Sequence, residues 1–428
     1  MERVRSLEIA SHVGERVKIC GWLQSMRRLG AVSFAVIRDG WGTVQAVVSE
    51  QKMAALDGVQ LESVVEVEGT VVAEPQVELH GVSVSVVSAA RAAPPVQLAK
   101  KLINAPLPAL LEHAVVANRH PTRRAVFRIG AAAMRGFRAA LDGRGFVEIQ
   151  SPKLVGGATE GGANVFAVKY FDRTAYLAQS PQLYKQIMVG VFERVYEVGP
   201  VFRAEPHDTV RHINQYTSLD VELGFIESHA DVMRVVVEVV REMIATAAAT
   251  CARELELLGV RMPTVPERVP ELHFEEAQAM VAAALGAHER GQPDLSPEGE
   301  RWLGGWAERE HGSEFLFVTG YPMSKRPFYT HPDETRPGSS RSFDLLFRGT
   351  ELVTGGQRLH RYDDYVAALD ARGMQREPLE AYLQAFAHGM PPHGGFAIGL
   401  ERWLMQLLGL PNIRLAVLFP RDLTRLSP

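Results

Sequence analysis

Hydrophobic and polar residues alternate over short runs in the first quarter of the chain. Five such runs are rich in β-branched residues and separated by glycine-containing turns, which predicts five β-strands, with a short helix near Gln51 to Leu56. The runs cover residues 16–27, 32–40, 43–50, 64–74 and 80–90. Short strands at this spacing are typical of a small closed barrel, and the OB-fold fits best. We therefore predict an OB-fold domain over residues 1–95.

The pattern changes after this barrel. Residues 96–122 contain clustered prolines, which predict a hinge or linker. Residues 122–145 then carry apolar side chains at three- and four-residue spacing and end at a glycine, which predicts an amphipathic helix. Strands and helices follow in mixed order, so we expect residues 123–428 to form one α+β domain.

Two further segments of this second domain have a clear pattern. A long helix is expected over residues 226–258, where Ser228 and Asp231 are spaced as a capping box. The region 262–340 is punctuated by prolines and contains two more helical patterns. We interpret it as a short insertion between functional segments.

Between Gln179 and Phe225 the chain combines apolar segments with closely spaced charges. The apolar segments predict a helix and then two strands, joined by a polar loop around residues 206–208. Arg-x-Glu ends one strand, Arg-His lies in the loop, and Asp-x-Glu ends the returning strand, so fixed charges should line one face. Such a face suits a nucleoside triphosphate, because arginine binds phosphate in a fork and carboxylates bind a metal or an amino group. A salt-bridged surface hairpin is the alternative.

A second group of charges follows the predicted insertion. Asp344 and Glu351 are seven positions apart and are separated by a predicted strand and turn. With the hydroxyl of Thr354 they offer the oxygen ligands that magnesium prefers. The sequence GGQR then predicts a tight turn that brings Arg358 toward the same place. Taken alone, two carboxylates on a strand pair also fit a solvent-exposed surface.

Composition narrows the class of protein. The 428 residues include 46% hydrophobic and 22% charged side chains, with a net charge of −4, which argues against indiscriminate nucleic-acid binding. No run of eighteen apolar residues and no export signal is present, and the two cysteines are too few for a disulfide framework, so a cytoplasmic protein is expected. Neither the Walker nor the dinucleotide-binding glycine motif occurs. The stretch 91–138 carries nine Lys or Arg against one acid, and fits either a phosphate backbone or arginines that bridge two domains.

Several motifs together resemble one family. FRAE, RH, Tyr216 and Asp-x-Glu, around residues 201–225, resemble motif two of the class II aminoacyl-tRNA synthetases. GFVEIQSPKL resembles motif one around 145–152, including the Pro152 position at a dimer interface, and HGGFAIGLERWLM resembles motif three around 393–407. QSPQLYKQ and GGQR resemble the amino-acid-binding segments of the aspartyl enzymes. The resemblance implies an OB-fold anticodon-binding barrel followed by a catalytic domain whose antiparallel sheet is flanked by helices, in the compact archaeal and eukaryotic form.

The resemblance also assigns roles to individual residues. The catalytic residues are Arg203, Glu205 and Arg402, with Arg402 on the γ-phosphate. ATP is bound by Arg203, Glu205, Arg211, His212, Tyr216, Glu351 and Arg402. Aspartate is bound by Glu160, Gln182, Lys185, Asp220, Thr354 and Arg358. Magnesium is carried by Asp344, Glu351 and Thr354, and the anticodon is contacted by Gln24, Phe34, Gln45, Glu78 and Ser83.

The resemblance implies activation of L-aspartate with ATP and transfer to tRNA(Asp) by a homodimer. Aspartate is preferred over asparagine because Lys185 and Arg358 supply two cations, one of which an amide would leave unpaired in a dry pocket, at a cost of ~2–5 kcal/mol. An asparaginyl-tRNA synthetase, an ATP-dependent asparagine synthetase and a non-catalytic RNA-binding paralogue are the alternatives. The intact barrel argues against the second, and the retained arginines and carboxylates argue against the third.

The sequence departs from the family pattern at several positions. Gln215 replaces a common Glu, Tyr216 replaces Phe or Trp, and Thr354 replaces Ser while keeping the oxygen. In the barrel, Gln24 stands where enzymes restricted to tRNA(Asp) often have Trp and where relaxed enzymes, which also charge tRNA(Asn), have His. Ser83 replaces a common Glu. These barrel changes leave open whether tRNA(Asn) is also charged and whether an amidotransferase acts downstream.

Overall fold

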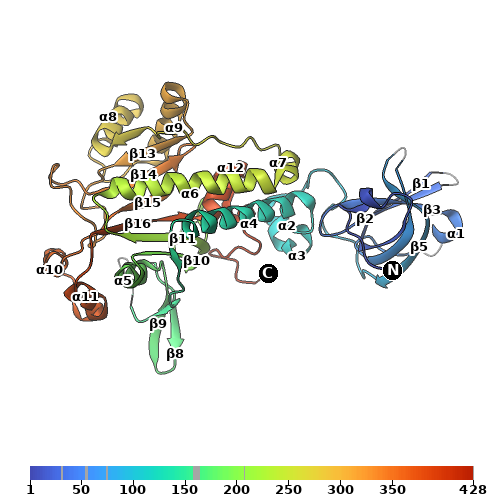
Figure 1. The fold of residues 1–428 in the computed structure, drawn as a ribbon, viewed down its shortest axis with the longest axis horizontal. Helices are drawn as coiled ribbons and strands as arrows, with labels where there is room; N and C mark the ends of the chain where they lie inside the picture. The colour runs from blue at the N-terminus through green and yellow to red at the C-terminus, as the bar shows by residue number, and fades with distance from the viewer. Residues whose placement is uncertain (30–31, 54–55, 74–75, 158–163, 207, 428) are drawn as a thin grey trace. The chain divides into compact units, whose positions relative to one another are not determined.

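The computed structural model describes residues 1–29, 32–53, 56–73, 76–157, 164–206 and 208–427. They divide into two compact units, Met1–Pro121 and Thr122–Pro428 (Figure 1). Of the helices in these ranges, none combines the length and apolar character that crossing a bilayer requires. Each unit has its own hydrophobic core.

The first unit contains a closed five-stranded barrel. Its elements are η1 (Ile9–His12), β1 (Arg16–Leu29), β2 (Val32–Arg38), β3 (Thr43–Ser49), α1 (Glu50–Met53), β4 (Val64–Val72) and β5 (Glu78–Ser88). The strands follow the order β1-β2-β3-β5-β4, and β1 closes the barrel by pairing with β4. Alternation of buried and accessible side chains along β1 places Val17, Ile19 and Leu23 inside. The predicted barrel is therefore confirmed.

The segment after the barrel is more structured than the predicted linker. It contains α2 (Leu107–Glu112) and α3 (Ala114–Ala117). Val96 and Leu98 are buried against Ala117 and form a small core of their own. Proline clustering correctly indicated a break in the strand pattern, but it did not reveal that the apolar residues between the prolines pack together.

The second unit is built on an eight-stranded sheet (Figure 1). In order across the sheet, its strands are β12 (Glu271–His273), β13 (Phe315–Thr319), β14 (Ser342–Phe347), β15 (Thr350–Gln357), β16 (His393–Gly399), β11 (Gln215–Gly224), β10 (Arg194–Phe202) and β6 (Val147–Glu148). The strands from β13 to β10 pair antiparallel, whereas β12 with β13 and β6 with β10 are parallel. The sheet is thus mixed, and antiparallel only in its centre. The region 262–340 supplies β12 and β13, so it is part of this sheet and the interpretation as an insertion is wrong.

Two long helices run side by side along the sheet (Figure 1), α4 (Pro121–Asp142) and α6 (His229–Thr250), and α7 (Ala252–Leu258) follows α6. α6 begins with the predicted capping box of Ser228 and Asp231. The two helices approach closely at Gly136, where a Cβ would lie 2.7 Å from the backbone oxygen of Glu242. Side chains of both helices share one core with apolar sheet residues such as Leu219. The opposite face of the sheet is left for the polar side chains.

The remaining elements complete the second unit. They are β7 (Leu154–Val155), β8 (Ala167–Tyr170) and β9 (Arg173–Leu177) in a small separate sheet, and the helices α5 (Gln182–Phe192), α8 (Phe274–Leu285), η3 (Ala287–Glu289), α9 (Pro297–His311), α10 (Tyr362–Ala371), η4 (Glu377–Leu379), α11 (Glu380–Ala387), α12 (Leu400–Leu408) and η5 (Ile413–Ala416). α12 starts directly after Gly399, as the glycine-to-helix pattern predicted.

Candidate active site

The site is organised by one face of strand β11. Side chains alternate along a strand, so Tyr216, Ser218, Asp220 and Glu222 point to the same side. Leu219, between them, points to the helix-covered core on the other side. The polar row begins at a cavity near Tyr216 and ends at a fully buried carboxylate, so one strand serves both an open and a closed part of the site.

Small residues on the neighbouring strands make room above this row. Asp220 lies in register with Ala397 of β16, and Glu222 lies in register with Gly395. A Cβ at Gly395 would come within 2.1 Å of Glu222 Oε2, so only glycine allows this carboxylate to lie across β16.

GGQR does not form the predicted tight turn. Gly355, Gly356 and Gln357 are the last residues of β15, and Arg358 follows in extended continuation. A Cβ at Gly355 would lie 2.4 Å from the ring of Phe343, and one at Gly356 would lie 2.8 Å from the Arg341 oxygen. The glycines therefore serve close packing within the sheet and not a chain reversal.

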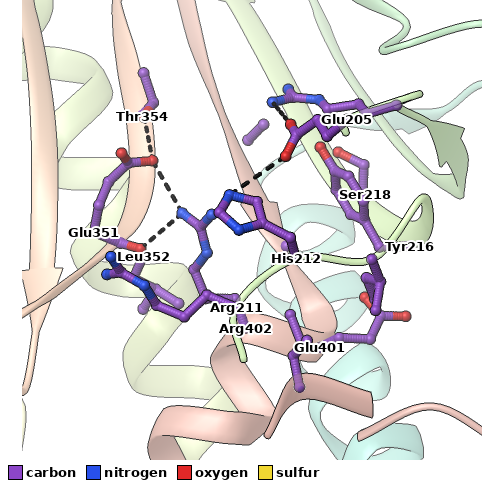
Figure 2. A pocket seen from close by; sticks show the side chains of 15 residues that line it. Glu205, Arg211, His212, Tyr216, Ser218, Glu351, Leu352, Thr354, Glu401 and Arg402 are labelled. Carbon is purple, nitrogen blue, oxygen red and sulfur yellow. Dashed lines mark hydrogen bonds and ion pairs between the residues drawn. The ribbon is translucent and has the colours of Figure 1, made fainter. Parts of the chain in front are cut away.

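A cavity of about 330 Å³ opens over the Tyr216 end. Figure 2 shows Glu351 and Thr354 on one side of it, Glu205, Ser218 and Tyr216 on the other, and His212 and Arg402 between them. The lining residues predicted for ATP are Arg203, Glu205, Arg211, His212, Tyr216, Glu351 and Arg402, and all of them are present. The structure thus brings together residues from motif two, from the β14–β15 hairpin and from motif three.

At one end of the cavity the carboxylate of Glu205 lies close to an arginine and a histidine. Arg203 lies 3.9 Å from Glu205, and the His212 ring nitrogen lies 3.4 Å from the other oxygen of Glu205. The Arg203 guanidinium also lies 5.7 Å from the centre of the Tyr216 ring. These contacts hold the ring and the arginine on one side of the cavity, next to Gly399, whose missing side chain leaves the ring open toward Arg402.

At the other end lies the predicted magnesium site. Thr354 donates to Glu351 over 3.0 Å, and Arg402 Nη1 lies 3.3 Å from the same oxygen of Glu351. Burial opposes ionisation of Glu351, but the Arg402 guanidinium and the Thr354 hydroxyl lower its pKa. Glu351 is therefore held as an anion in the cavity.

Asp344, the third predicted magnesium ligand, is already bound by an arginine. It lies on β14 in register with Thr354, but its Oδ1 accepts a 3.0 Å hydrogen bond from Arg326. Burial raises the pKa of Asp344 to about 6, against the opposing effect of Arg326, and the charge of Glu351 adds to the rise. Within the described residues no group of three or more His, Cys, Asp or Glu could hold a metal. Two carboxylates and a hydroxyl still fit magnesium, which commonly takes its other ligands from phosphates and water.

The buried end of the row, where aspartate binding is predicted, is a network of four charged side chains. Lys185 Nζ lies 3.1 Å from Asp220 Oδ1 and 3.4 Å from Glu222, and it also donates to the backbone oxygens of Val221 and Phe396. Arg358 Nε donates to Glu222 over 2.9 Å. Burial opposes ionisation of Glu222, but Arg358 and Lys185 lower its pKa. Both predicted cations are thus already neutralised by carboxylates.

This network corrects the simple argument for aspartate. An amide would not leave a bare cation, because Asp220 and Glu222 balance Lys185 and Arg358 without a substrate. Lys185 uses its three protons on protein oxygens. Arg358 places Nε and Nη2 on Glu222 and on Gly395 O, and its Nη1 makes no hydrogen bond to another described residue. Among the described residues, Arg358 Nη1 is therefore the donor of this network that has no protein acceptor.

Two other predicted aspartate ligands have different outcomes. Gln182 is the first residue of α5 and is buried, and its Nε2 lacks a hydrogen-bond partner within the described chain. An unpaired buried amide nitrogen is costly, so it is suited to a ligand oxygen. Glu160 lies outside the described residues.

Three charged residues of the site were not assigned from the sequence. The sequence indicates Glu222 only as part of Asp-x-Glu, although its i+2 spacing from Asp220 places it on the same face. Arg326 and Glu300 lie in the region 262–340, and only the tertiary structure brings them to Asp344 and Glu351. Burial and the neighbouring Glu351 raise the pKa of Glu300 to about 7.

Of the predicted anticodon residues, Ser83 is exposed, Gln24, Phe34 and Gln45 are half-buried, and Glu78 is buried. Phe34 is half-buried and outside the barrel core, between the inward-facing Ser33 and Ala35. Gln45 Nε2 donates to Glu78 over 2.8 Å. Burial opposes ionisation of Glu78, but hydrogen bonds from His80 and Gln45 lower its pKa.

The two barrel residues that depart from the family pattern are Gln24 and Ser83. Gln24 sits where the β1–β2 register shifts, and its buried Oε1 has no partner within the described residues. A register shift of this kind turns a side chain away from the regular alternation. Ser83 is exposed on β5, opposite Glu68 of β4.

The arginine-rich stretch 91–138 is used within each unit. Arg119 pairs with Glu62 in the first unit, over 3.2 Å. In the second unit Arg128 pairs with Glu254 over 2.6 Å, and Arg138 binds Glu148. These contacts account for three of the nine basic residues of the stretch by pairing within one unit.

Comparison with known proteins agrees with this geometry. The family model of class II tRNA synthetases (D, K and N) matches residues 108–423, and that of the OB-fold nucleic acid binding domain matches residues 17–87. The chain is 47% identical to the aspartate–tRNA(Asp/Asn) ligase of Thermus thermophilus over 100% of both chains, and 45% identical to that of Deinococcus radiodurans over 100% of this chain and 99% of the other. The crystal structure of asparaginyl-tRNA synthetase from Pyrococcus horikoshii complexed with asparaginyl-adenylate superposes with a TM-score of 0.92, at 32% identity and 100% coverage of both chains. The chain therefore belongs to the class II tRNA synthetases of the D, K and N group and carries the OB-fold nucleic-acid-binding domain.

Proposed function

We propose that the protein is an aspartate–tRNA ligase. The observation that carries this proposal is Arg358, which Glu222 and Gly395 O hold in place while its Nη1 stays available for a carboxylate. A guanidinium nitrogen is charged and can donate but not accept, so Nη1 prefers a carboxylate to an amide. Full-length relatives at 45–47% identity are named aspartate–tRNA(Asp/Asn) ligase. The asparaginyl enzyme shares the fold but is less similar in sequence, at 32%.

In the first step, an oxygen of the aspartate α-carboxylate attacks the α-phosphorus of ATP. The bond to the bridging oxygen of pyrophosphate breaks, and pyrophosphate leaves with the electron pair. Arg203 is assigned to the α-phosphate, Glu205 to the adenine side, Tyr216 to the adenine ring, and Arg211 and Arg402 to the β- and γ-phosphates. These side chains act by holding the reactants in line and by neutralising charge, so no covalent enzyme intermediate is required.

In the second step, the 3′-hydroxyl of the terminal adenosine of tRNA attacks the activated carbonyl carbon. The acyl–phosphate bond breaks and AMP leaves, and the hydroxyl proton passes to the leaving phosphate or to solvent. Arg203 remains on the α-phosphate, where the leaving-group charge grows. Arg358 and Gln182 keep the aspartyl side chain fixed during the transfer. Glu160 is assigned to the α-ammonium group of the aspartyl residue.

Magnesium is proposed as the metal of this site. Glu351 and Thr354 line the cavity, and Asp344 faces them from β14, so these three residues would hold it. Bound there, magnesium would neutralise triphosphate charge. Two arginines orient the proposed carboxylate ligands: Arg326 donates to Asp344, and Arg402 donates to Glu351.

We propose Gln24, Phe34, Gln45, Glu78 and Ser83 as the anticodon-reading surface. A half-buried aromatic ring beside amide and carboxylate groups suits stacking and base-edge recognition. Relaxed recognition, with tRNA(Asn) charged as well, is supported by the names of the two relatives. A homodimer, a cytoplasmic location and a downstream amidotransferase stay predictions.

The proposal is tested by aspartate-dependent ATP–pyrophosphate exchange and by aminoacylation of tRNA(Asp) and tRNA(Asn) transcripts. Exchange with aspartate and not with asparagine is expected. Charging of both transcripts supports the relaxed form, and charging of tRNA(Asp) alone refutes it. Exchange with asparagine in place of aspartate would refute the proposal as a whole.

A further inference from the structure

Glu300 occupies a position at the active site that none of the assigned roles includes. It lies in the first turn of α9, after the N-cap Ser296, and its side chain is 13% exposed.

The Gly304 and Gly349 pair explains how a helix from another region reaches the site. A Cβ at Gly304 would lie 2.5 Å from Gly349, and one at Gly349 would lie 2.8 Å from the Arg301 Cα. The missing side chains let α9 lie directly on the β14–β15 turn.

This close approach gives Glu300 two contacts in the site. Its Oε2 accepts a hydrogen bond of 3.3 Å from the backbone nitrogen of Glu351, where the pairing of β14 and β15 is irregular. The same oxygen lies 3.7 Å from Nη1 of Arg211. Arg402 in turn binds the side chain and the backbone oxygen of Glu351. Glu300 thus connects the motif-two loop to the residue that faces the triphosphate end.

The two contacts act on groups that would otherwise be loosely held. A backbone nitrogen released from a strand ladder needs another acceptor, and Glu300 supplies it. Arg211 is a long side chain at a cavity edge, and a fixed carboxylate reduces the number of conformations that it has to give up when a phosphate binds.

We propose that Glu300 is a positioning residue of the triphosphate site, which fixes Glu351 through its backbone and Arg211 through its charge. The inference rests on the proposed function for the identity of the nucleotide. Because both contacts lie at the Arg211–Glu351 end and not at Tyr216, the effect of Glu300 is specific for the β- and γ-phosphates. Replacement of Glu300 therefore weakens ATP and leaves AMP unaffected.

The test is isothermal titration of ATP and of AMP, in magnesium buffer, into the wild-type protein, Glu300→Ala, Glu300→Gln and Glu310→Ala. Glu300→Ala is expected to weaken ATP binding about tenfold, from the loss of one charged hydrogen bond and one ion pair, and to leave AMP binding unchanged. Glu300→Gln keeps an acceptor for the Glu351 nitrogen, so it should restore part of the ATP affinity. Glu310, exposed at the far end of the same helix, is the matched control.

In exchange assays the Ala variant should raise the KM for ATP while the KM for aspartate stays unchanged. Equal weakening of ATP and AMP would show a general structural defect and overturn the inference. Unchanged ATP binding would overturn the inference as well, because Glu300 would then have no effect on this site. Tighter ATP binding would also overturn it, because Glu300 would then only repel phosphate. Wild-type exchange with aspartate is measured first: its absence refutes the proposed function, whereas normal exchange with unaltered binding by Glu300→Ala refutes this inference alone.

Discussion

Replacement of Arg358 by Gln tests the aspartate pocket directly. Arg358 is buried, with Nε on Glu222 at 2.9 Å and Nη2 on Gly395 O at 3.1 Å. Truncating one partner of a buried, hydrogen-bonded charge pair costs ~2–5 kcal/mol. For substrate this corresponds to a loss of roughly thirty- to several-thousand-fold in kcat/KM for aspartate. The KM for ATP should stay unchanged, because Arg358 does not line the ATP cavity.

The same substitution should also lower the melting temperature. Glu222 would keep only Lys185, at 3.4 Å, as a cationic partner in a fully buried position. Arg361→Gln is the control, since this nearby side chain is 69% exposed and its pair with Asp364 contributes ~0–1 kcal/mol.

The assay is ATP–pyrophosphate exchange with aspartate and with asparagine, together with thermal unfolding. Asparagine makes no charge pair with Arg358, so its kcat/KM should change less, and the preference for aspartate should fall. An unchanged kcat/KM for aspartate in a folded Arg358→Gln variant would refute the reasoning. A parallel loss for Arg361→Gln would show that the effect is not specific to the pocket.

Three further results are expected. Gly395→Ala should raise the KM for aspartate in exchange assays, because the new Cβ would lie 2.1 Å from Glu222 Oε2; an unaltered KM would contradict the packing argument. Glu351→Gln should raise the magnesium concentration needed for half-maximal exchange, since it removes a ligand charge, and an unchanged magnesium dependence would exclude it as a ligand. Burial raises the pKa of Glu401 to about 7 from its ordinary value of 4.5 while it accepts from the Thr217 nitrogen. Between pH 4.5 and about pH 7 the folded state binds more protons than the unfolded state. Glu401 therefore makes the free energy of unfolding fall as the pH rises toward 7, by up to ~3 kcal/mol. Glu401→Gln should therefore flatten urea-unfolding stability over this range, and an unchanged slope would contradict the assignment.

The sequence predicted the elements where periodicity and local chemistry act alone. Alternation along residues 16–27 indicated a strand whose apolar side lines a barrel, and the Ser228–Asp231 spacing indicated the start of α6. The resemblance of the motif-two and motif-three segments to a known family predicted which charged residues lie together, and the structure places them around one cavity. Failures occurred where a local pattern has two explanations. GGQR could mark a turn or a tightly packed strand, and only the neighbouring Phe343 decides for the strand.

The sequence by itself determined which side chains share a face of each element, and therefore that Tyr216, Asp220 and Glu222 point the same way. Only the tertiary structure decided what these side chains meet. It placed Glu222 between Lys185 and Arg358, Arg326 on Asp344, and Glu300 on Glu351. The physical reason is that strand and helix periods are local properties of the backbone. Charge pairing between distant segments depends instead on strand order and on glycines that permit close approach, and neither can be read from one segment.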